Sequence, residues 1–321
     1  MKITVIGCGR WGAFLTWYLD KIGHNVTLYG RKGSRNMERF LLSRRNDLLE
    51  LPKSVILSTN PAEAAKDADV VVISIDSQGL RGVFTELAAL SLTNKNFVLC
   101  MKGIEISSGK RLTEIADEFI GENGKVAVWL GPGHVQEFYA GIPNCMVIDS
   151  RDESFKRQLV EEFSSELIRL YYGEDLIGNE IGAAAKNVIG IAAGMLDGRH
   201  LSSLKGALMA RGAREVARLI LAMGGNELSA YGLCHLGDYE ATVFSKYSHN
   251  RRFGEAFVTG EEAEGLAEGY YTVRALMKLC AEANVEMPIC NAVYQILYEG
   301  KSPDEALGAL FERRVQKEFY R

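Results

Sequence analysis

The fold class follows from residues 3–12, which read ITVIGCGRWG near the start of the chain. A β-branched apolar run leads directly into a G-x-G-x-x-G turn formed by Gly7, Gly9 and Gly12. Glycines at this spacing permit a tight turn, a close approach of pyrophosphate to the backbone, and close packing of a helix on the strand. The pattern predicts a strand, a dinucleotide-binding turn and a helix. A tight turn that binds no ligand is the alternative reading.

Short apolar runs alternate with segments of helical length through the first half of the chain. One run, VVVISI over Val70–Ile75, is apolar on both faces and should lie at the centre of a sheet with helices on each side. We therefore predict an α/β, Rossmann-like, doubly wound and mainly parallel sheet. Its expected strands are Ile3–Ile6, Asn25–Tyr29, Val55–Ser58, Val70–Ile75, Phe97–Cys100, Val126–Trp129, Met146–Ile148 and Leu167–Tyr172.

The pattern changes after Tyr172 to long helical segments with almost no strand between them. The chain has 321 residues, which exceeds the roughly 250–300 residues at which a single hydrophobic core usually stops growing. We expect a dinucleotide-binding domain over 1–178 and an all-helical C-terminal domain over 179–321 that binds substrate and supplies catalytic residues. The expected helices of the second domain include Ile181–Leu196, Ser203–Met223, Gly260–Ala283 and Asn291–Glu299.

Composition favours a small ligand over a macromolecular partner. The formal net charge is -4 and the basic residues are scattered, so no general field attracts nucleic acid or an anionic membrane. No apolar run reaches the roughly 20 residues that span a bilayer, and the start of the chain lacks the basic leader of an export signal. The six cysteines form no C-x-x-C pair, which indicates buried thiols rather than a metal site or disulfides. We expect a soluble, cytoplasmic protein without a metal.

The end of the second expected strand bears on the choice of dinucleotide. NAD-binding proteins often carry an acidic residue there for the ribose hydroxyls, whereas this chain reads YGRK over 29–32. Arg31 suits a 2′-phosphate, which slightly favours NADP, and it is also compatible with a solvated surface charge. The cofactor prediction is therefore NADP or NAD.

A lysine and an asparagine interrupt an expected helix of small and apolar residues, IGAAAKNVIG over 181–190. Such a helix is packed on most sides, and an unpaired buried ammonium is costly. Lys186 therefore requires a partner, a substrate oxygen or a lowered pKa, which makes it the first catalytic candidate. The alternative is a lysine at the helix edge that extends its ammonium to solvent.

Polar residues gather in LGDYEAT over 236–242 and in SHNRRFG over 248–254. Guanidinium and polar groups close to glycines suit recognition of a phosphorylated substrate. Asp238 is available to accept a hydrogen bond from a substrate hydroxyl or from the catalytic ammonium. An exposed loop with a capping aspartate is the alternative reading.

Two loops of the first half follow expected strands, MKGIE over 101–105 and GPGHVQE over 131–137. Ligands bind in the crevice beyond the carboxyl ends of parallel strands. Lys102 and the backbone of Gly131–Val135 are therefore expected to face the nicotinamide half of the cofactor or the substrate. His134, in the second loop, is more typical of a structural or exposed turn residue than of a catalytic acid.

These motifs, in this order and over nearly the whole chain, resemble the bacterial NAD(P)-dependent sn-glycerol-3-phosphate dehydrogenases. The resemblance rests on the GxGxxG, MKGIE and GPxxxxE motifs, on AAAKNV over 183–188, ALMARG over 207–212, LGDxxxT over 236–242 and SxNRRxG over 248–254, and on AEG over 267–269 and VEMP over 285–288. It implies reversible reduction of dihydroxyacetone phosphate to sn-glycerol 3-phosphate for glycerophospholipid synthesis, by a homodimer.

The resemblance also implies roles for individual residues. Lys186 is the implied general acid, which protonates the developing alkoxide as the nicotinamide delivers hydride to the ketone carbon, while Asp238 orients Lys186. The implied catalytic residues are Lys186, Asp238, Lys102, Asn187 and Thr242. The implied substrate-binding residues are Lys102, Gly131, Gly133, Lys186, Asp238, Ser248, His249 and Asn250. The implied cofactor-binding residues are Gly7, Gly9, Arg10, Trp11, Gly12, Arg31, Lys102, Val135, His249, Leu266 and Glu268.

Two positions depart from the family pattern. The family usually has Ser or Thr where this chain has Gly133, and Arg where it has His249. A guanidinium binds phosphate through a permanently charged fork, whereas imidazole is half neutral near its ordinary pKa of ~6.5. Either Arg251 or Arg252 replaces the missing guanidinium, or phosphate binds more weakly and in a pH-dependent way. Another NAD(P)-dependent reductase of the same architecture, acting on a different keto substrate, is the alternative function; a non-catalytic dinucleotide sensor would lack the lysine and its polar partners.

Overall fold

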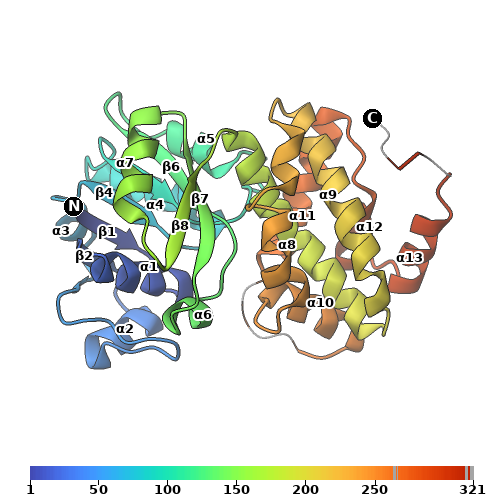
Figure 1. The fold of residues 1–321 in the computed structure, drawn as a ribbon, viewed down its shortest axis with the longest axis horizontal. Coiled ribbons are helices and arrows are strands. Elements are labelled where there is room, and N and C mark those ends of the chain that lie inside the picture. The colour runs from blue at the N-terminus through green and yellow to red at the C-terminus, as the bar shows by residue number, and fades with distance from the viewer. Residues whose placement is uncertain (263–264, 266, 315–316, 319–321) are drawn as a thin grey trace. The chain divides into compact units, whose positions relative to one another are not determined.

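The computed structural model describes residues 1–262, 265, 267–314 and 317–318, which form two compact units (Figure 1). The sheet unit comprises Met1–Met101 and Leu112–Leu176, and the helical unit comprises Lys102–Arg111 together with the chain from Ile177 onward. The segment Lys102–Arg111 therefore packs with the helices, although it lies within the range 1–178 that was expected for the first domain.

The sheet unit contains eight strands in the order β3-β2-β1-β4-β5-β6-β7-β8. All neighbouring strands are parallel except β6 and β7, which are antiparallel. The predicted fold class, a doubly wound and mainly parallel sheet followed by a helical domain, is confirmed. The strands are β1 (Lys2–Ile6), β2 (Asn25–Tyr29), β3 (Ile56–Ser58), β4 (Val70–Ile73), β5 (Asn96–Leu99), β6 (Lys125–Leu130), β7 (Asn144–Ser150) and β8 (Ile168–Tyr172).

The order of the strands defines where this sheet binds ligands. Strand β1 pairs with β2 on one side and with β4 on the other, so the chain changes direction across the sheet at the carboxyl end of β1. Such a switch point opens a crevice outside the strand ends, where doubly wound sheets bind their ligands. The glycine-rich turn follows β1 directly and therefore lies at this point.

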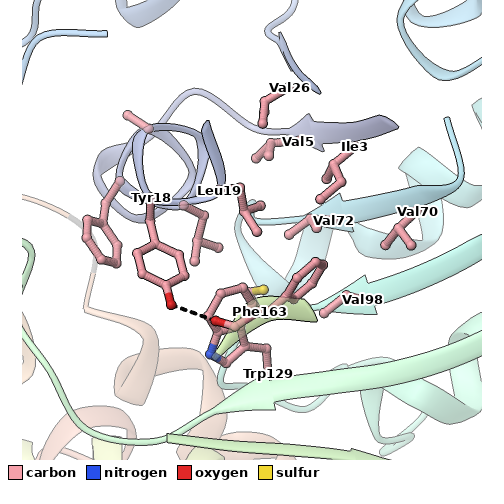
Figure 2. Packing of buried hydrophobic residues seen from close by; sticks show 14 of the residues in the cluster. Ile3, Val5, Tyr18, Leu19, Val26, Val70, Val72, Val98, Trp129 and Phe163 are labelled. Atoms are coloured by element: carbon pink, nitrogen blue, oxygen red, sulfur yellow. Dashed lines mark hydrogen bonds between the residues drawn. The ribbon is translucent and has the colours of Figure 1, made fainter. Parts of the chain in front are cut away.

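Apolar side chains fill the space between the sheet and its helices (Figure 2). The predicted central strand β4 is buried along its whole length, as expected for a strand covered on both faces. Tyr18 of helix α1 is fully buried, and its hydroxyl donates to the backbone oxygen of Phe163 at 2.6 Å. The ring of Phe163 stacks on Trp129 at 5.4 Å between centroids. These contacts fix α1, and with it the turn that precedes α1, against the sheet.

The helices of the sheet unit are short. They are α1 (Arg10–Lys21), α2 (Arg35–Ser43), α3 (Pro61–Ala65), η1 (Ser77–Gly79), α4 (Leu80–Ala89), α5 (Leu112–Asp117), α6 (Val135–Tyr139) and α7 (Glu153–Phe163). No helix among the described residues is long and apolar enough to cross a membrane.

The helical unit is built around α8, which is apolar on nearly all sides and therefore buried. Gly190 and Gly194 of α8 allow neighbouring segments to approach, because a Cβ at Gly190 would lie 2.7 Å from Thr242 and one at Gly194 would overlap the backbone of Arg251. The elements are α8 (Leu176–Gly198), η2 (Ser202–Leu204), α9 (Lys205–Ala222), η3 (Glu227–Tyr231), η4 (Leu236–Asp238), η5 (Glu240–Phe244), α10 (His249–Thr259), α11 (Glu268–Ala283), α12 (Pro288–Tyr298) and α13 (Pro303–Phe311).

One predicted helix was too long. The expected segment Gly260–Ala283 begins as α11 only at Glu268, because Gly260 ends α10 with a positive φ of 77°. Glycine adopts this left-handed conformation without steric cost and commonly ends helices.

Candidate active site

The glycine-rich turn at the carboxyl end of β1 has the geometry that a dinucleotide requires. Gly7 has a φ of +114°, and a Cβ there would overlap the carbonyl of Ser74. A Cβ at Gly12 would overlap the carbonyl of Gly7, so both positions exclude larger residues. Gly9 caps α1 without a side chain and has open space where a Cβ would lie. The amino terminus of α1 is therefore accessible to a pyrophosphate, and the turn fits NAD or NADP.

The two residues that follow Gly9 differ in their surroundings. Arg10 is exposed at the start of α1. Trp11 is half-buried, and its ring lies 5.1 Å from Phe14 and 6.2 Å from Phe138, so it is part of the packing of the sheet unit. Of these two predicted cofactor contacts, Arg10 therefore remains accessible, whereas Trp11 is largely engaged by its neighbours.

The end of β2 carries positive charge. Arg31, Lys32 and Arg35 are all exposed, and residues 29–35 contain no carboxylate. Gly30 is tightly enclosed, because a Cβ there would lie 2.7 Å from the sulfur of Cys8. These three basic side chains can attract a 2′-phosphate. No side chain over residues 29–35 offers the carboxylate that often accepts from a ribose hydroxyl.

The loop after β6 explains one departure from the family pattern. Gly131 and Gly133 both have positive φ values, 129° and 142°. A Cβ at Gly133 would overlap the ring of Phe138, which is buried and stacks on Phe14 at 5.1 Å. In this chain the Phe138 ring occupies the space that a Ser or Thr side chain needs. Val135 begins α6 and is buried.

Two lysines share one carboxylate in the helical unit. Asp238, at the end of η4, is buried, and its Oδ2 atom lies 2.9 Å from Nζ of Lys186 and 2.7 Å from Nζ of Lys102. Lys186 also donates to Oγ1 of Thr242 at 2.8 Å. The Lys186 side chain is only 8% exposed, so it does not extend its ammonium to solvent from the helix edge. Thr242 lies in η5, a short π-helix, which is an element often found at functional sites.

The position of Lys186 lowers its pKa from 10.5 to about 8. Burial is the largest cause, because it disfavours the charged form, and the charge of Lys102 acts in the same direction. Asp238 opposes them by attraction and by its hydrogen bond, and the charge of Glu268 also raises the pKa. The Lys186 amine is therefore mostly in its charged ammonium form near neutral pH, and it can release a proton at slightly higher pH.

A chain of amide contacts connects Lys186 to α10 and α11. Asn187 donates from Nδ2 to the backbone oxygen of Lys102 at 2.9 Å and accepts from Nδ2 of Asn250 at 3.1 Å. Oδ1 of Asn250 accepts from the backbone N–H of Gly269 at 2.8 Å. Both asparagine side chains thus have fixed orientations. The structure brings together Lys102, Lys186, Asn187, Asp238, Thr242 and Asn250 in the helical unit.

Ser248 and His249 lie at the start of α10. Ser248 is buried and caps the helix by accepting from the N–H of Arg251 at 3.3 Å, which leaves its hydroxyl engaged in the fold. Nδ1 of His249 lies 3.1 Å from the guanidinium of Arg252. Glu268 begins α11, and Leu266, the remaining predicted cofactor contact, lies outside the described residues.

Sequence reasoning missed two residues that support Asp238. His235 is fully buried, with Nδ1 2.8 Å from the backbone oxygen of Gly182 and Nε2 2.7 Å from the hydroxyl of Tyr239. Nδ1 therefore donates to the carbonyl and Nε2 accepts from the tyrosine, and burial lowers the pKa of His235 to about 4. His235 thus anchors the chain to α8 on one side of Asp238, and Tyr239, on the other side in the sequence, holds the imidazole in place. The only signal in the sequence was their position close to that aspartate.

A doubly wound sheet with a dinucleotide turn, together with a helical unit that holds a buried lysine beside a carboxylate, defines a two-unit NAD(P)-dependent dehydrogenase. Domain models described as the N-terminus and the C-terminus of NAD-dependent glycerol-3-phosphate dehydrogenase match residues 2–156 and 175–308. The chain belongs to the NAD-dependent glycerol-3-phosphate dehydrogenase family, and it is an oxidoreductase.

Individual relatives match the chain over its whole length. A glycerol-3-phosphate dehydrogenase of Thermotoga sp. (strain RQ2), named as NAD(P)-dependent, is 35% identical over 100% of this chain and 99% of its own. A glycerol-3-phosphate dehydrogenase of Exiguobacterium sp., also named as NAD(P)-dependent, is 36% identical over 98% of this chain and 96% of its own length. The crystal structure of glycerol-3-phosphate dehydrogenase from Coxiella burnetii superposes with a TM-score of 0.91 at 27% identity, covering 97% of this chain and 99% of that one.

Proposed function

We propose that this chain reduces dihydroxyacetone phosphate to sn-glycerol 3-phosphate with NAD(P)H, reversibly, and that Lys186 is the proton donor. The single observation that carries the proposal is the buried Lys186 ammonium, held 2.9 Å from Asp238. We assign cofactor binding mainly to the sheet unit. Catalysis and most substrate binding are assigned to the helical unit. When bound, the reduced nicotinamide supplies the hydride that the ketone carbon receives.

The contacts of Lys186 define what it can do. An ammonium has three N–H donors, and Lys186 directs two of them at Asp238 and Thr242. The third is left for the oxygen of the substrate, which becomes an alkoxide as the carbon accepts hydride. Transfer of a proton from Nζ to this oxygen completes the alcohol and leaves a neutral amine beside Asp238. Asp238 and Thr242 thus orient the donor, and Lys102 adds positive charge that stabilises the developing oxyanion.

Substrate contacts are proposed in each unit, at the polar residues around this lysine and at the loop after β6. We assign substrate contacts to Lys102, Lys186, Asp238, Ser248, His249, Asn250, Gly131 and Gly133. The Ser248 oxygen accepts from Arg251 as the cap of α10, and its O–H remains a donor for the substrate. Asn187 fixes Asn250 and the backbone of Lys102, which makes it a positioning residue.

The cofactor contacts are assigned to the turn over Gly7–Gly12, to Arg31, Lys102, Val135 and His249, and to Leu266 and Glu268. The exposed Arg31, Lys32 and Arg35 at the end of β2 favour NADP, because they supply positive charge for a 2′-phosphate. A direct comparison of NADPH and NADH as reductants decides this preference. Replacement of Arg31 by Ala should raise the KM for NADPH and leave the KM for NADH nearly unchanged.

The reaction is tested by following nicotinamide absorbance when the purified protein meets dihydroxyacetone phosphate with NADPH, and separately with NADH. Oxidation of either cofactor supports the proposal and ranks the two. If both cofactors bind and neither is oxidised, the proposed reduction of dihydroxyacetone phosphate is contradicted. A panel of other keto compounds then tests the second candidate, a reductase for a different keto substrate, which His249 favours because the family usually has an arginine there.

We also propose that the enzyme acts in the cytoplasm as a homodimer and supplies glycerol 3-phosphate for glycerophospholipid synthesis. The described cysteines form no disulfide with one another and five of them are buried, which suits a reducing compartment. Light scattering of the purified protein tests the homodimer, and a single protomer mass would contradict it. Cell fractionation tests the location.

A further inference from the structure

Two arginines follow His249 on α10, and the structure gives them different partners. Nε of Arg251 lies 2.6 Å from Oδ2 of Asp197, and its NH2 group lies 3.3 Å from Glu255. Asp197, near the end of α8, is 8% exposed and also accepts from Nζ of Lys205 at 2.5 Å. Arg251 is therefore committed to a nearly buried carboxylate that fixes α10 to α8, and moving it to a ligand would break that pairing.

Arg252 lies on the same side of the helix as His249, because residues three apart are neighbours on a helix surface. Its NH2 group lies 3.1 Å from Nδ1 of His249. Since a guanidinium only donates, Nδ1 accepts, and the proton of the neutral imidazole is on Nε2. The ring also lies close to Gly265, where a Cβ would be only 2.6 Å from Nδ1. His249 thereby orients the exposed guanidinium of Arg252 at the first turn of α10.

This turn is fixed beside the catalytic lysine. Asn250, the residue after His249, contacts Asn187, which is adjacent to Lys186 in α8. The substrate proposed above carries a doubly charged phosphate, and a planar guanidinium binds phosphate through two parallel hydrogen bonds. We propose that Arg252, oriented by His249, binds the substrate phosphate in place of the arginine that the family usually has at position 249, and that Arg251 does not. This inference rests on the proposed function.

The test compares a substrate that carries the phosphate with one that lacks it. Arg252→Ala should lower kcat/KM for dihydroxyacetone phosphate by roughly 10- to 100-fold, the usual effect of losing hydrogen bonds to a charged group. It should leave the much lower kcat/KM for dihydroxyacetone unchanged. Arg157→Ala serves as the control, because Arg157 is an exposed arginine of α7 in the sheet unit that pairs with Glu153. Equal losses for both substrates in Arg252→Ala, or no loss for dihydroxyacetone phosphate, overturn the assignment.

The orienting role of His249 toward Arg252, which is separate from its assigned ligand contacts, has its own test. His249→Ala should raise the KM for dihydroxyacetone phosphate with little change in kcat, and His249→Gln, whose amide oxygen can accept from Arg252, should recover part of the loss. An unchanged KM in His249→Ala would contradict this role. Arg251→Ala should destabilise the fold and lower kcat/KM for both substrates. If kcat/KM fell only for dihydroxyacetone phosphate, Arg251 rather than Arg252 would be the residue that binds the phosphate.

A binding measurement separates this inference from the reaction itself. In calorimetric titration of the whole protein with inorganic phosphate, Arg252→Ala should weaken binding and Arg157→Ala should not. If the wild-type protein reduces no dihydroxyacetone phosphate, the proposed function fails, and this titration alone decides the role of Arg252. Equal affinity of the wild type and Arg252→Ala for phosphate then overturns it.

Discussion

The Oδ2 atom of Asp238 lies 2.9 Å from Nζ of Lys186, and both side chains are almost wholly buried. Burial and the neighbouring Lys102 favour the neutral amine, whereas Asp238 favours the ammonium. The opposing effects leave the pKa of Lys186 at about 8, which is within reach of physiological pH. A general acid is most effective when its pKa is near the working pH, so this pair is suited to proton transfer.

The pH dependence of turnover should differ between the two directions. Reduction requires the Lys186 ammonium, so its kcat should fall as pH rises through about 8. Oxidation of glycerol 3-phosphate requires the neutral amine, so its kcat should rise over the same range. Measurement of kcat in both directions from about pH 6 to about pH 10 checks this. Parallel profiles in the two directions would contradict proton transfer by Lys186.

Replacement of Asp238 by Asn should move the pH profile as well as reduce the rate. The carboxylate raises the pKa of Lys186, so its loss should lower that pKa below about 8 and shift the fall in reduction to lower pH. We expect kcat near neutrality to drop by roughly 10²- to 10⁴-fold. Thr242→Val is the matched control, because it removes one hydrogen bond and keeps the carboxylate; its profile should remain near that of the wild type. An unmoved profile in Asp238→Asn would show that Asp238 does not set the pKa.

Restoring the family residue at position 133 should harm this protein. Gly133→Ser places a Cβ into the ring of Phe138 at a positive φ, so we expect a loss of about 1–3 kcal/mol in the free energy of unfolding. Urea unfolding measures it. In combination with Phe138→Ala the loss should be smaller than the sum of the single effects, because the ring that opposes the serine is gone. Additive losses would mean that the two positions do not interact.

Glu215 should make stability depend on pH. It is buried in α9 and accepts from the N–H groups of Ile289 and Cys290 at 2.9 and 3.0 Å at the start of α12. Burial raises its pKa from 4.5 to about 7, so between these values the folded state holds a proton that the unfolded state releases. Stability from this group is present below pH 4.5 and is lost as pH rises through about 7.

Glu215→Gln removes this titration. As pH rises, the wild type should therefore lose up to about 3 kcal/mol of unfolding free energy relative to the variant. The amide can also change stability by a constant amount, but that amount does not vary with pH. Urea unfolding at several pH values tests this. A difference that stays constant with pH would contradict the raised pKa.

The sequence predicted those features that depend on local pattern. The strand, the three glycines and the apolar run VVVISI identified the sheet and its nucleotide turn, because these patterns report directly on backbone geometry and burial. The cost of burying an ammonium predicted that Lys186 has a partner, and Asp238 was a named candidate. Both features needed only the residue types and their spacing.

Other features depend on contacts between residues far apart in the chain. The packing of Lys102–Arg111 with the helices and the pairing of Arg251 with Asp197 have no local signature. The start of α11 was expected at Gly260, whereas the helix begins at Glu268 and Gly260 instead ends α10. The reason for Gly133 became visible only with the ring of Phe138 in place.

Replacement of Lys186 by Ala, with turnover and cofactor binding measured on the same preparation, tests most directly whether this lysine is the proton donor. We predict that kcat for reduction of dihydroxyacetone phosphate falls by about 10²- to 10⁴-fold, as for loss of a general acid. The dissociation constants for NADH and NADPH should remain close to those of the wild type. A variant that retains turnover, or one that loses only its affinity for the cofactor, would contradict the assignment of Lys186 as the proton donor.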